Sequence, residues 1–398
     1  MGKCAVTSKR AVTSKRAVTK GARSSYCIVW QRRRAAAAAA LPAGNRRHRA
    51  PRLAKTPAKA FDSKVSWEGD NLLEVTDLAV TFASQEGRVQ AVDGVSFGIR
   101  EGETVGLVGE SGCGKSISAL AILGLVRMMS NSTVTGKVEF MGRDLLALPE
   151  HEVRRVRGRD MSMIFQDPVT SLNPVLSIER QTTEGMENHL GLSHSDAVKR
   201  SIELLEMVGI PKAAERIRDY PHQFSGGMRQ RVMIAIALSC NPKLLLADEP
   251  TTALDVTIQA QILRLMKQLS HDYGSAIILI THDLGVVAGM TERILVMYAG
   301  RIVESASAGE LFAHPHHPYT VGLLRSVPRL DEPRKGSLQS IDGLPPDLAH
   351  LPAGCAFAAR CELRTEQCRL ERPPLAATTP GRLSACFHSD QLVGAPAT

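Results

Sequence analysis

Hydrophobic and polar residues alternate over residues 73–80, which read Leu-Glu-Val-Thr-Asp-Leu-Ala-Val. This alternation is typical of a strand with one buried face. A second strand is predicted over 91–99, and Gln85-Glu86-Gly87 before it fits a hairpin turn. We therefore expect the folded part of the chain to begin with antiparallel strands.

Farther along the chain, short uninterrupted hydrophobic runs replace the alternation. They occupy residues 104–108, 161–165, 244–247, 276–280 and 294–298. Such runs predict strands buried on both faces. The segments between them are helical in pattern, notably 116–126 and most of 171–238, with a break at Pro221. We expect an α/β fold with a mainly parallel sheet and an added antiparallel layer.

The composition changes near residue 65. The chain has 398 residues, 43% of them hydrophobic, and a net charge of +9. Residues 1–64 hold 17 Lys and Arg against one acidic residue, and they repeat Ala-Val-Thr-Ser-Lys-Arg. Such a segment cannot bury enough apolar surface to fold, so we treat residues 1–66 as a basic tail. The remainder is mildly acidic, and the high pI is therefore no argument for nucleic-acid binding.

Three interpretations of this tail stay open. It is an upstream segment that the cell does not translate, a basic tail that contacts anionic lipid or nucleic acid, or an organelle transit peptide. The first is favoured because no Met occurs between Met1 and Met128, so a start near Val65 would need a different codon. The sequence contains no run of about 18 apolar residues, so it predicts no membrane-spanning helix.

A glycine-rich loop joins the strand at 104–108 to the helix that follows. It matches the phosphate-loop pattern of Gly, four residues and Gly-Lys-Ser, with Gly109, Glu110, Ser111, Gly112, Cys113, Gly114, Lys115 and Ser116. The glycines let backbone N–H groups point toward an anion, and the helix N-terminus adds partial positive charge. Lys115 can reach the β- and γ-phosphates, while the Ser116 hydroxyl suits Mg²⁺.

Polar residues follow three other predicted strands. Asp248 and Glu249 end one strand, Gln166 ends another, and His282 lies two residues after a third. Asp248 can hold the Mg²⁺ shell beside Ser116, with Gln166 nearby. Glu249 can orient and deprotonate a water molecule, and His282 can contact the γ-phosphate. Together these residues predict hydrolysis of a nucleoside triphosphate.

A Ser-Gly-Gly turn opens another apolar helix. The sequence Ser225-Gly226-Gly227-Met228-Arg229-Gln230 resembles the signature loop of the ATP-binding cassette (ABC) family, and Asp255 resembles that family's D-loop. The common signature reads Leu-Ser-Gly-Gly-Gln, from which Phe224 and Met228 depart at the outer positions. The resemblance covers about residue 72 to at least residue 304, with every core motif in order.

The ABC resemblance implies a RecA-like P-loop NTPase fold, a cassette over residues 67–323 with a helical subdomain at about 167–238. It also implies that ATP lies between the phosphate loop and the signature loop of a second cassette. Ser225, Gly226, Gly227 and Asp255 would thus act on ATP held by a partner, either a related ATPase or a second copy. Phe82 is a candidate to stack on the adenine, although a core position at a strand end explains it equally well.

A narrower resemblance covers the C-terminal region, residues 324–398, and the segment just before it. His317-Pro318-Tyr319-Thr320, Gly343-Leu344-Pro345-Pro346 and Gly354-Cys355 look like the extension of dipeptide and oligopeptide importer ATPases. This resemblance implies a peripheral position on the cytoplasmic face of the cell membrane, beneath two permeases, with an extracytoplasmic solute-binding protein delivering peptide. The same family also imports nickel, glutathione or other solutes. A soluble ABC ATPase acting on ribosomes or DNA is a more distant alternative, and we expect no nucleic-acid partner.

Four cysteines gather near the C-terminus, namely Cys355, Cys361, Cys368 and Cys386. Their spacing matches neither common zinc pairs nor bacterial ferredoxins, so spacing alone supports no particular metal. Resemblance to importer ATPases with a [4Fe–4S] cluster here favours that cluster, of structural or regulatory role. Zinc and free thiols remain open.

Overall fold

The computed structural model describes residues 71–85, 87–252, 254–326 and 341–392. The predicted basic tail, residues 1–66, lies outside the described residues, as do parts of the C-terminal region. Across the described ranges, no helix combines the length and the hydrophobicity needed to cross a bilayer.

The two predicted alternating segments lie in a four-stranded antiparallel sheet in the order β2-β1-β4-β5, in which β4 and β5 were not predicted. Its strands are β1 (Asn71–Ser84), β2 (Gly87–Arg100), β4 (Ser132–Phe140) and β5 (Arg143–Asp144). Ser84 pairs with Gly87, which places the hairpin turn where the sequence predicts it. The predicted antiparallel layer is confirmed, and both strands of the hairpin are longer than their alternating cores.

The five predicted apolar runs form β3, β6, β7, β8 and β9 of an eight-stranded sheet in the order β11-β12-β10-β9-β3-β8-β7-β6, and its other three strands were not predicted. The five strands from β9 to β6 are parallel, whereas β10, β12 and β11 pair antiparallel. Their bounds are β3 (Thr104–Val108), β6 (Met161–Ile164), β7 (Leu244–Asp248), β8 (Ala276–Thr281), β9 (Arg293–Tyr298), β10 (Arg301–Ser307), β11 (Ala376–Thr379) and β12 (Arg382–Ser384). Parallel pairing brings the carboxyl ends of β3, β6, β7 and β8 to one edge of the sheet.

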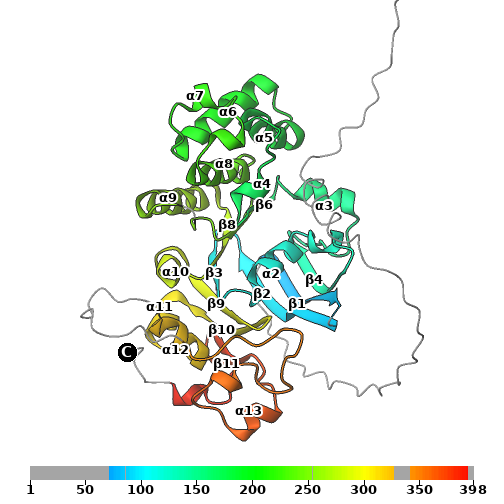
Figure 1. Ribbon diagram of the computed structural model, residues 1–398, viewed down its shortest axis with the longest axis vertical. Helices are drawn as coiled ribbons and strands as arrows, with labels where there is room; N and C mark the ends of the chain where they lie inside the picture. Colours follow the sequence, from blue (N-terminus) through cyan, green and yellow to red (C-terminus); the bar gives the residue numbers. More distant parts are fainter. Residues whose placement is uncertain (1–70, 86, 253, 327–340, 393–398) are drawn as a thin grey trace, which may run out of the picture. The chain divides into compact units, whose positions relative to one another are not determined.

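The predicted helical segments 116–126 and 171–238 contain α2 and the helices from α5 to α8, with different ends, and Figure 1 shows how the helices lie around the sheets. Their bounds are α2 (Lys115–Ile122), α3 (Glu150–Val156), α4 (Pro168–Ser171), α5 (Ile178–Gly185), α6 (His194–Met207), α7 (Ala213–Arg216), α8 (Gly226–Leu238), α9 (Val256–Tyr273), α10 (Leu284–Met290), α11 (Ala308–Ala313), α12 (Pro318–Arg325) and α13 (Glu366–Leu370). Helix α2 stops four residues before the expected Val126. Its end is followed by Gly124 in a left-handed conformation (φ +69°).

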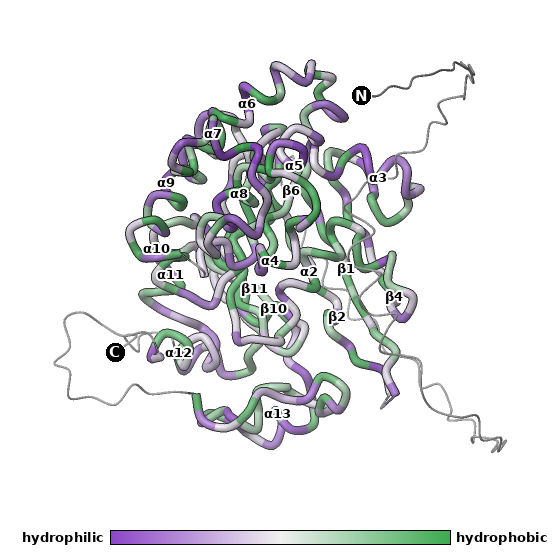
Figure 2. Tube along the Cα trace, turned by 45° about the horizontal axis from the view of Figure 1, so that its top comes forward, coloured by the Kyte–Doolittle hydropathy of each residue, from purple (hydrophilic) through white to green (hydrophobic). Residues whose placement is uncertain are grey.

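Two large hydrophobic clusters hold these layers together. One joins the antiparallel sheet and α2 to one face of the mixed sheet. The other joins the opposite face to the helices between α4 and α9. Figure 2 shows hydrophobic residues along β1 and β6 and hydrophilic ones around α7. The sheet edge is therefore fixed by packing on both of its faces.

The C-terminal region is continuous with the cassette's sheet. Strand β12 pairs with β10 through Glu304–Ser384 and Ser305–Leu383. A third hydrophobic cluster, which includes Tyr298, Tyr319 and Phe357, packs residues after 340 against β9 and α12. The segment after 340 thus shares both strands and core with the cassette.

Candidate functional site

The phosphate loop lies between β3 and α2, as predicted, and two of its glycines have no room for a side chain. Gly109 has φ +153°, and a Cβ there would lie 2.2 Å from the Met297 carbonyl oxygen. Gly114 has φ +109°, and a Cβ there would lie 2.4 Å from the Ala91 carbonyl oxygen. Close packing and backbone conformation together therefore require glycine at these positions.

Lys115 begins α2 with its side chain turned back along the loop. Its ammonium donates to the carbonyl oxygens of Gly109 (2.7 Å) and Glu110 (2.8 Å). The ammonium therefore lies across the concave side of the loop, where a phosphate would gain a charge-assisted hydrogen bond. Burial raises the pKa of the neighbouring Cys113 thiol, against the opposing effect of Lys115, so this cysteine is a neutral packing residue.

Asp248 ends β7 beside Ser116, as predicted for a magnesium site. Its side chain is buried, with a residue exposure of 4%, and its Oδ1 atom has no hydrogen-bond partner among the described residues. Burial raises the pKa of this carboxyl, while a hydrogen bond with Ser116 and the charge of Lys115 act in the opposite direction. A buried carboxylate oxygen without a partner next to a hydroxyl fits the oxygen ligands of Mg²⁺. Ser116 and Asp248 are therefore the residues that could hold this ion.

Glu249 is brought together with Gln166 and His282, although these residues come from three different strands. Gln166 Nε2 donates to Glu249 Oε2 at 3.0 Å, and His282 Nδ1 lies 2.9 Å from Glu249 Oε1. Burial alone would raise the pKa of Glu249, but the hydrogen bonds from His282 and Gln166 lower it overall. The carboxylate is thus ionised and oriented, which is what a general base requires.

These side chains face an open cavity of about 360 Å³ together with Ser111 of the phosphate loop. Glu249 has φ +45°, an uncommon conformation for a residue other than glycine. Strained backbone often marks functional residues, and here it directs the carboxylate toward Gln166 and His282. The cavity can accommodate a phosphate chain and a water molecule between the loop and the carboxylate.

The remaining predicted nucleotide contacts lie elsewhere in the fold. Ser225 caps α8 by accepting from Met228 N (3.4 Å), and Asp255 caps α9 by accepting from Ile258 N (3.1 Å). Gly226 and Gly227 form the first turn of α8. None of these residues lines the cavity around Glu249. Phe82 is half-buried on β1 and packs against the core, so its predicted stacking on adenine stays a prediction.

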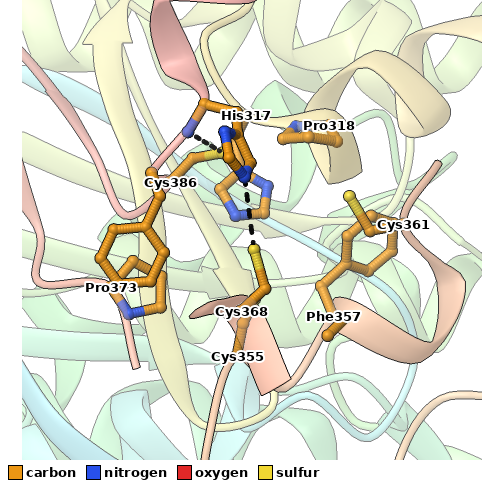
Figure 3. Close-up of a pocket in the computed structure, with 11 residues that line it drawn as sticks. His317, Pro318, Cys355, Phe357, Cys361, Cys368, Pro373 and Cys386 are labelled. Carbon is orange, nitrogen blue, oxygen red and sulfur yellow. Dashed lines mark hydrogen bonds between the residues drawn. The ribbon is translucent and has the colours of Figure 1, made fainter. Parts of the chain in front are cut away.

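The four C-terminal cysteines line one small cavity (Figure 3). The cavity is about 20 Å³, and Cys355, Cys361, Cys368 and Cys386 share it with His317 and Phe357. All four are free thiols, and Cys355 N donates to the Cys368 carbonyl oxygen at 2.8 Å. Within the described ranges, no three His, Cys, Asp or Glu side chains are arranged for a single metal ion.

Burial governs the chemistry of this cavity. It raises the pKa of Cys355 and Cys361 and that of Cys386 to about 11, so the thiols are neutral without a cation. It also lowers the pKa of His317 to about 4. His388 Nε2 lies 3.6 Å from Cys368 Sγ. The sequence does not predict this contact, because it depends on the turn after Cys386, which places the His388 ring next to Cys368.

Sequence reasoning also misses two residues that touch the phosphate loop. Tyr319 and Arg360 both bind Glu110, from more than 200 positions away. The sequence shows that Arg360 precedes Cys361, but it does not show that Glu110 is the partner of Arg360. Only the packing of the C-terminal region reveals this pair.

Comparison with known proteins agrees with this geometry. The ABC transporter family matches residues 92–252, and the family "Oligopeptide/dipeptide transporter, C-terminal region" matches residues 303–368. Two solved dimeric structures of MJ0796, one of them bound to ADP and Pi, align with TM-scores of 0.54 and identities of 28–29%. Each covers 59% of this chain and 98% of the compared chain.

Curated relatives match over most of their length. The oligopeptide transport ATP-binding protein OppD of Salmonella typhimurium is 52% identical over 316 residues, which cover 79% of this chain and 93% of OppD. The dipeptide transport ATP-binding protein DppD of Bacillus subtilis is 49% identical over 322 residues, which cover 81% of this chain and 96% of DppD. An ATPase site on an ABC fold, joined to this C-terminal region, leads to one conclusion: the chain is an ATP-hydrolysing member of the ABC transporter family, in the branch of oligopeptide and dipeptide transport ATP-binding proteins.

Proposed function

We propose that this protein is the ATP-hydrolysing subunit of an ABC importer that takes up oligopeptides or dipeptides across the cytoplasmic membrane. The observation that carries the proposal is the match of residues 303–368 to the oligopeptide/dipeptide family, in a part of the chain that is joined to the cassette through the pairing of β12 with β10. The relatives that match over nearly their full length are named for oligopeptide and dipeptide transport. Import of nickel, glutathione or another solute is less favoured, and a soluble ATPase acting on nucleic acid still less.

In the proposed reaction, the loop of residues 109–116 holds the phosphates of ATP through backbone N–H groups and Lys115. Ser116 and, through water, Asp248 would hold Mg²⁺, with Gln166 nearby. When bound, this ion neutralises negative charge on the phosphates. Glu249 accepts a proton from the attacking water, and its bonds to Gln166 and His282 keep it deprotonated. His282 additionally reaches the γ-phosphate, so positioning and charge account for most of the catalysis.

The site is completed by a second cassette. The turn Ser225–Gly227 at the N-terminus of α8 is built to bind phosphate but does not line the cavity of its own chain. In the proposed dimer, with a related ATPase or a second copy, this turn and Asp255 act on the partner's ATP. The dimeric state of the similar MJ0796 structures supports this arrangement.

Two membrane permeases and an extracytoplasmic solute-binding protein complete the proposed system, with this subunit peripheral on the cytoplasmic face. The segment after Gln166 would receive the permeases, because it exposes Val169 (60%) and Val175 (76%) to solvent. Exposed apolar side chains of this kind mark protein contacts when they gather on one surface.

The four cysteines are proposed to hold a [4Fe–4S] cluster of structural or regulatory role. Four thiols around one cavity supply the ligand number of such a cluster. The thiols would have to separate around it, because the present cavity has room for about one water molecule. Protein purified without oxygen should be brown and absorb near about 400 nm, and Cys361→Ser should lose the colour. Colourless protein without iron would refute the proposed cluster. Elemental analysis for zinc would then distinguish a zinc site from free thiols.

Isolation of the tagged protein from its own membranes tests the importer proposal. We expect two integral membrane proteins and a second ABC ATPase to co-purify in fixed ratio. A Val175→Asp variant should lose the membrane proteins and keep ATP binding, because only the proposed permease contact is altered. Recovery of nucleic acid or ribosomes in place of membrane proteins would refute the proposal.

A further inference from the structure

Glu110, the second residue of the phosphate loop, is held from three sides. Its carbonyl oxygen accepts from Lys115, and its backbone N–H donates to the Tyr319 hydroxyl at 2.8 Å. Its carboxylate binds the Arg360 guanidinium in a bidentate pair, with 2.7 Å to Nη1 and 2.9 Å to Nη2. Two of these three contacts come from the C-terminal part of the chain rather than from the loop or its helix.

The Arg360 side chain is almost fully enclosed, with 5% exposure, compared with 24% for Glu110. It also donates to the carbonyl oxygens of Asp342 (3.0 Å) and Ile341 (3.3 Å). Bidentate charged pairs are among the strongest side-chain hydrogen bonds, and burial of one partner limits screening by salt. Arg360 is therefore positioned firmly enough to fix the orientation of Glu110.

The elements that carry Tyr319 and Arg360 are packed against each other. Phe357 lies 5.5 Å from the Tyr319 ring and 5.3 Å from the Tyr298 ring, measured between centroids. Arg360 ends the short turn that begins at Phe357, where its N–H donates to the Phe357 carbonyl oxygen at 3.0 Å. The same turn carries Cys361 and lines the cysteine cavity. The C-terminal region thus contacts the phosphate loop through one rigid aromatic cluster.

We propose that Arg360 and Tyr319 are positioning residues for nucleotide binding, which hold Glu110 and through it the phosphate loop in the conformation that receives the phosphates. Arg360 also neutralises the carboxylate of Glu110, which would otherwise repel the triphosphate. The inference rests on the proposal that residues 109–116 bind ATP. It assigns to the C-terminal region a direct part in the affinity of the cassette for nucleotide.

A double-mutant cycle on the full chain tests this inference, with the affinity for a fluorescent ATP analogue as the readout. Arg360→Met should weaken binding about tenfold, because it releases Glu110 from its bidentate pair. Glu110→Gln weakens the same pair from the other side, so the double variant Glu110→Gln/Arg360→Met should bind no more weakly than Arg360→Met alone. If Arg360 acted through a different contact, the effects of the two substitutions would add. In steady-state hydrolysis, KM for ATP should rise more than kcat falls.

Arg372→Met is the matched control. Arg372 also lies in the C-terminal region and also binds an acidic residue of the cassette, Asp93, at 3.0 Å, but it does not touch the loop. Its removal should leave nucleotide affinity unchanged. Equal affinities of the Arg360→Met and Arg372→Met variants, or additive effects of Arg360→Met and Glu110→Gln, would overturn the inference.

Two further variants distinguish a failure of this inference from a failure of Arg360→Met to fold and from a failure of the proposed phosphate site. Tyr319→Phe loses one hydroxyl group and keeps the aromatic packing, so it decides the question if Arg360→Met does not fold. We expect a several-fold weaker affinity, and an unchanged affinity counts against the inference. Lys115→Ala should abolish binding. If it does so while Arg360→Met has no effect, the inference alone fails; if Lys115→Ala binds normally, the proposed phosphate site fails and the inference with it.

Discussion

At the residue scale, the chemistry depends on two carboxylates in succession with different surroundings. Asp248 is buried, and its Oδ1 atom has no hydrogen-bond partner in the part of the chain that the structure describes, whereas Glu249 reaches the cavity and is held by Gln166 and His282. Asp248 is the last residue of β7, whereas Glu249 follows the strand with a positive φ, so the two side chains point in different directions. The environment of Asp248 therefore suits a ligand of Mg²⁺, and that of Glu249 suits a base that accepts a proton from water.

Replacing Glu249 by Gln should leave ATP binding intact and slow hydrolysis by about 10²–10⁴-fold, because the amide keeps the hydrogen bonds but cannot take a proton. The variant should accumulate as an ATP-bound dimer, visible by size-exclusion chromatography. Lys115→Ala is the contrasting control, since it should lose nucleotide affinity and form no such dimer. Wild-type turnover by Glu249→Gln would show that another group is the base.

The meeting of the phosphate loop, Gln166, Asp248, Glu249 and His282 at one sheet edge could be expected from the sequence, because each of them ends or follows a buried strand of the parallel sheet. Lys115 and Ser116 occupy the positions after the loop that the pattern requires. The bond between Glu110 and Arg360 was not predictable, because 250 positions separate these residues. A lone Arg beside a cysteine has many possible partners, and only the packing of the C-terminal region selects one.

At the scale of elements, the first hairpin and the five parallel strands were predicted, whereas β4 and β10 were missed and the element ends were less accurate. Hydrophobic runs identify buried strands such as β8, all of whose residues are buried. Helix α2 ends early at Ile122, where Gly124 allows the chain to turn. The pairing of β12 with β10 was not predicted, because a three-residue strand carries too little pattern to be recognised.

The joint between β10 and β12 should make stability depend on pH. Glu304 on β10 is buried at 1% exposure beside Arg382 and the backbone N–H of His316, and burial raises its pKa to about 7. In the unfolded chain the Glu304 carboxyl has its ordinary pKa of about 4.5, so the folded state binds this proton more tightly than the unfolded state. The free energy of unfolding should therefore fall as the pH rises from about 4.5 to about 7.

Glu304→Gln tests this expectation, because the amide resembles the protonated acid at every pH. As the pH rises from about 4.5 to about 7, the melting temperature of the wild type should decrease relative to that of the variant. The corresponding loss in the free energy of unfolding is at most a few kcal/mol. Parallel curves of melting temperature against pH for the two proteins would show that Glu304 does not titrate in this range.

At the scale of the whole molecule, the charge is unevenly distributed. The first 64 residues carry the basic excess, and the rest of the sequence is mildly acidic. Removal of residues 1–64 should therefore leave both ATP hydrolysis and assembly with the permeases intact, because such a segment can form no core. Comparison of the truncated and full-length proteins in a membrane pull-down measures this, and loss of the permeases on truncation would assign the tail a function.

The central claim is that ATP hydrolysis at Glu249 drives peptide uptake, and transport in proteoliposomes tests it most directly. The vesicles would contain this chain, its partner ATPase and both permeases, with the solute-binding protein outside and ATP trapped inside. We expect a labelled oligopeptide or dipeptide to accumulate with the wild type, and uptake to be lost without ATP and strongly reduced with Glu249→Gln. Accumulation of nickel or glutathione in place of peptide, or peptide uptake unaffected by Glu249→Gln, would contradict the account.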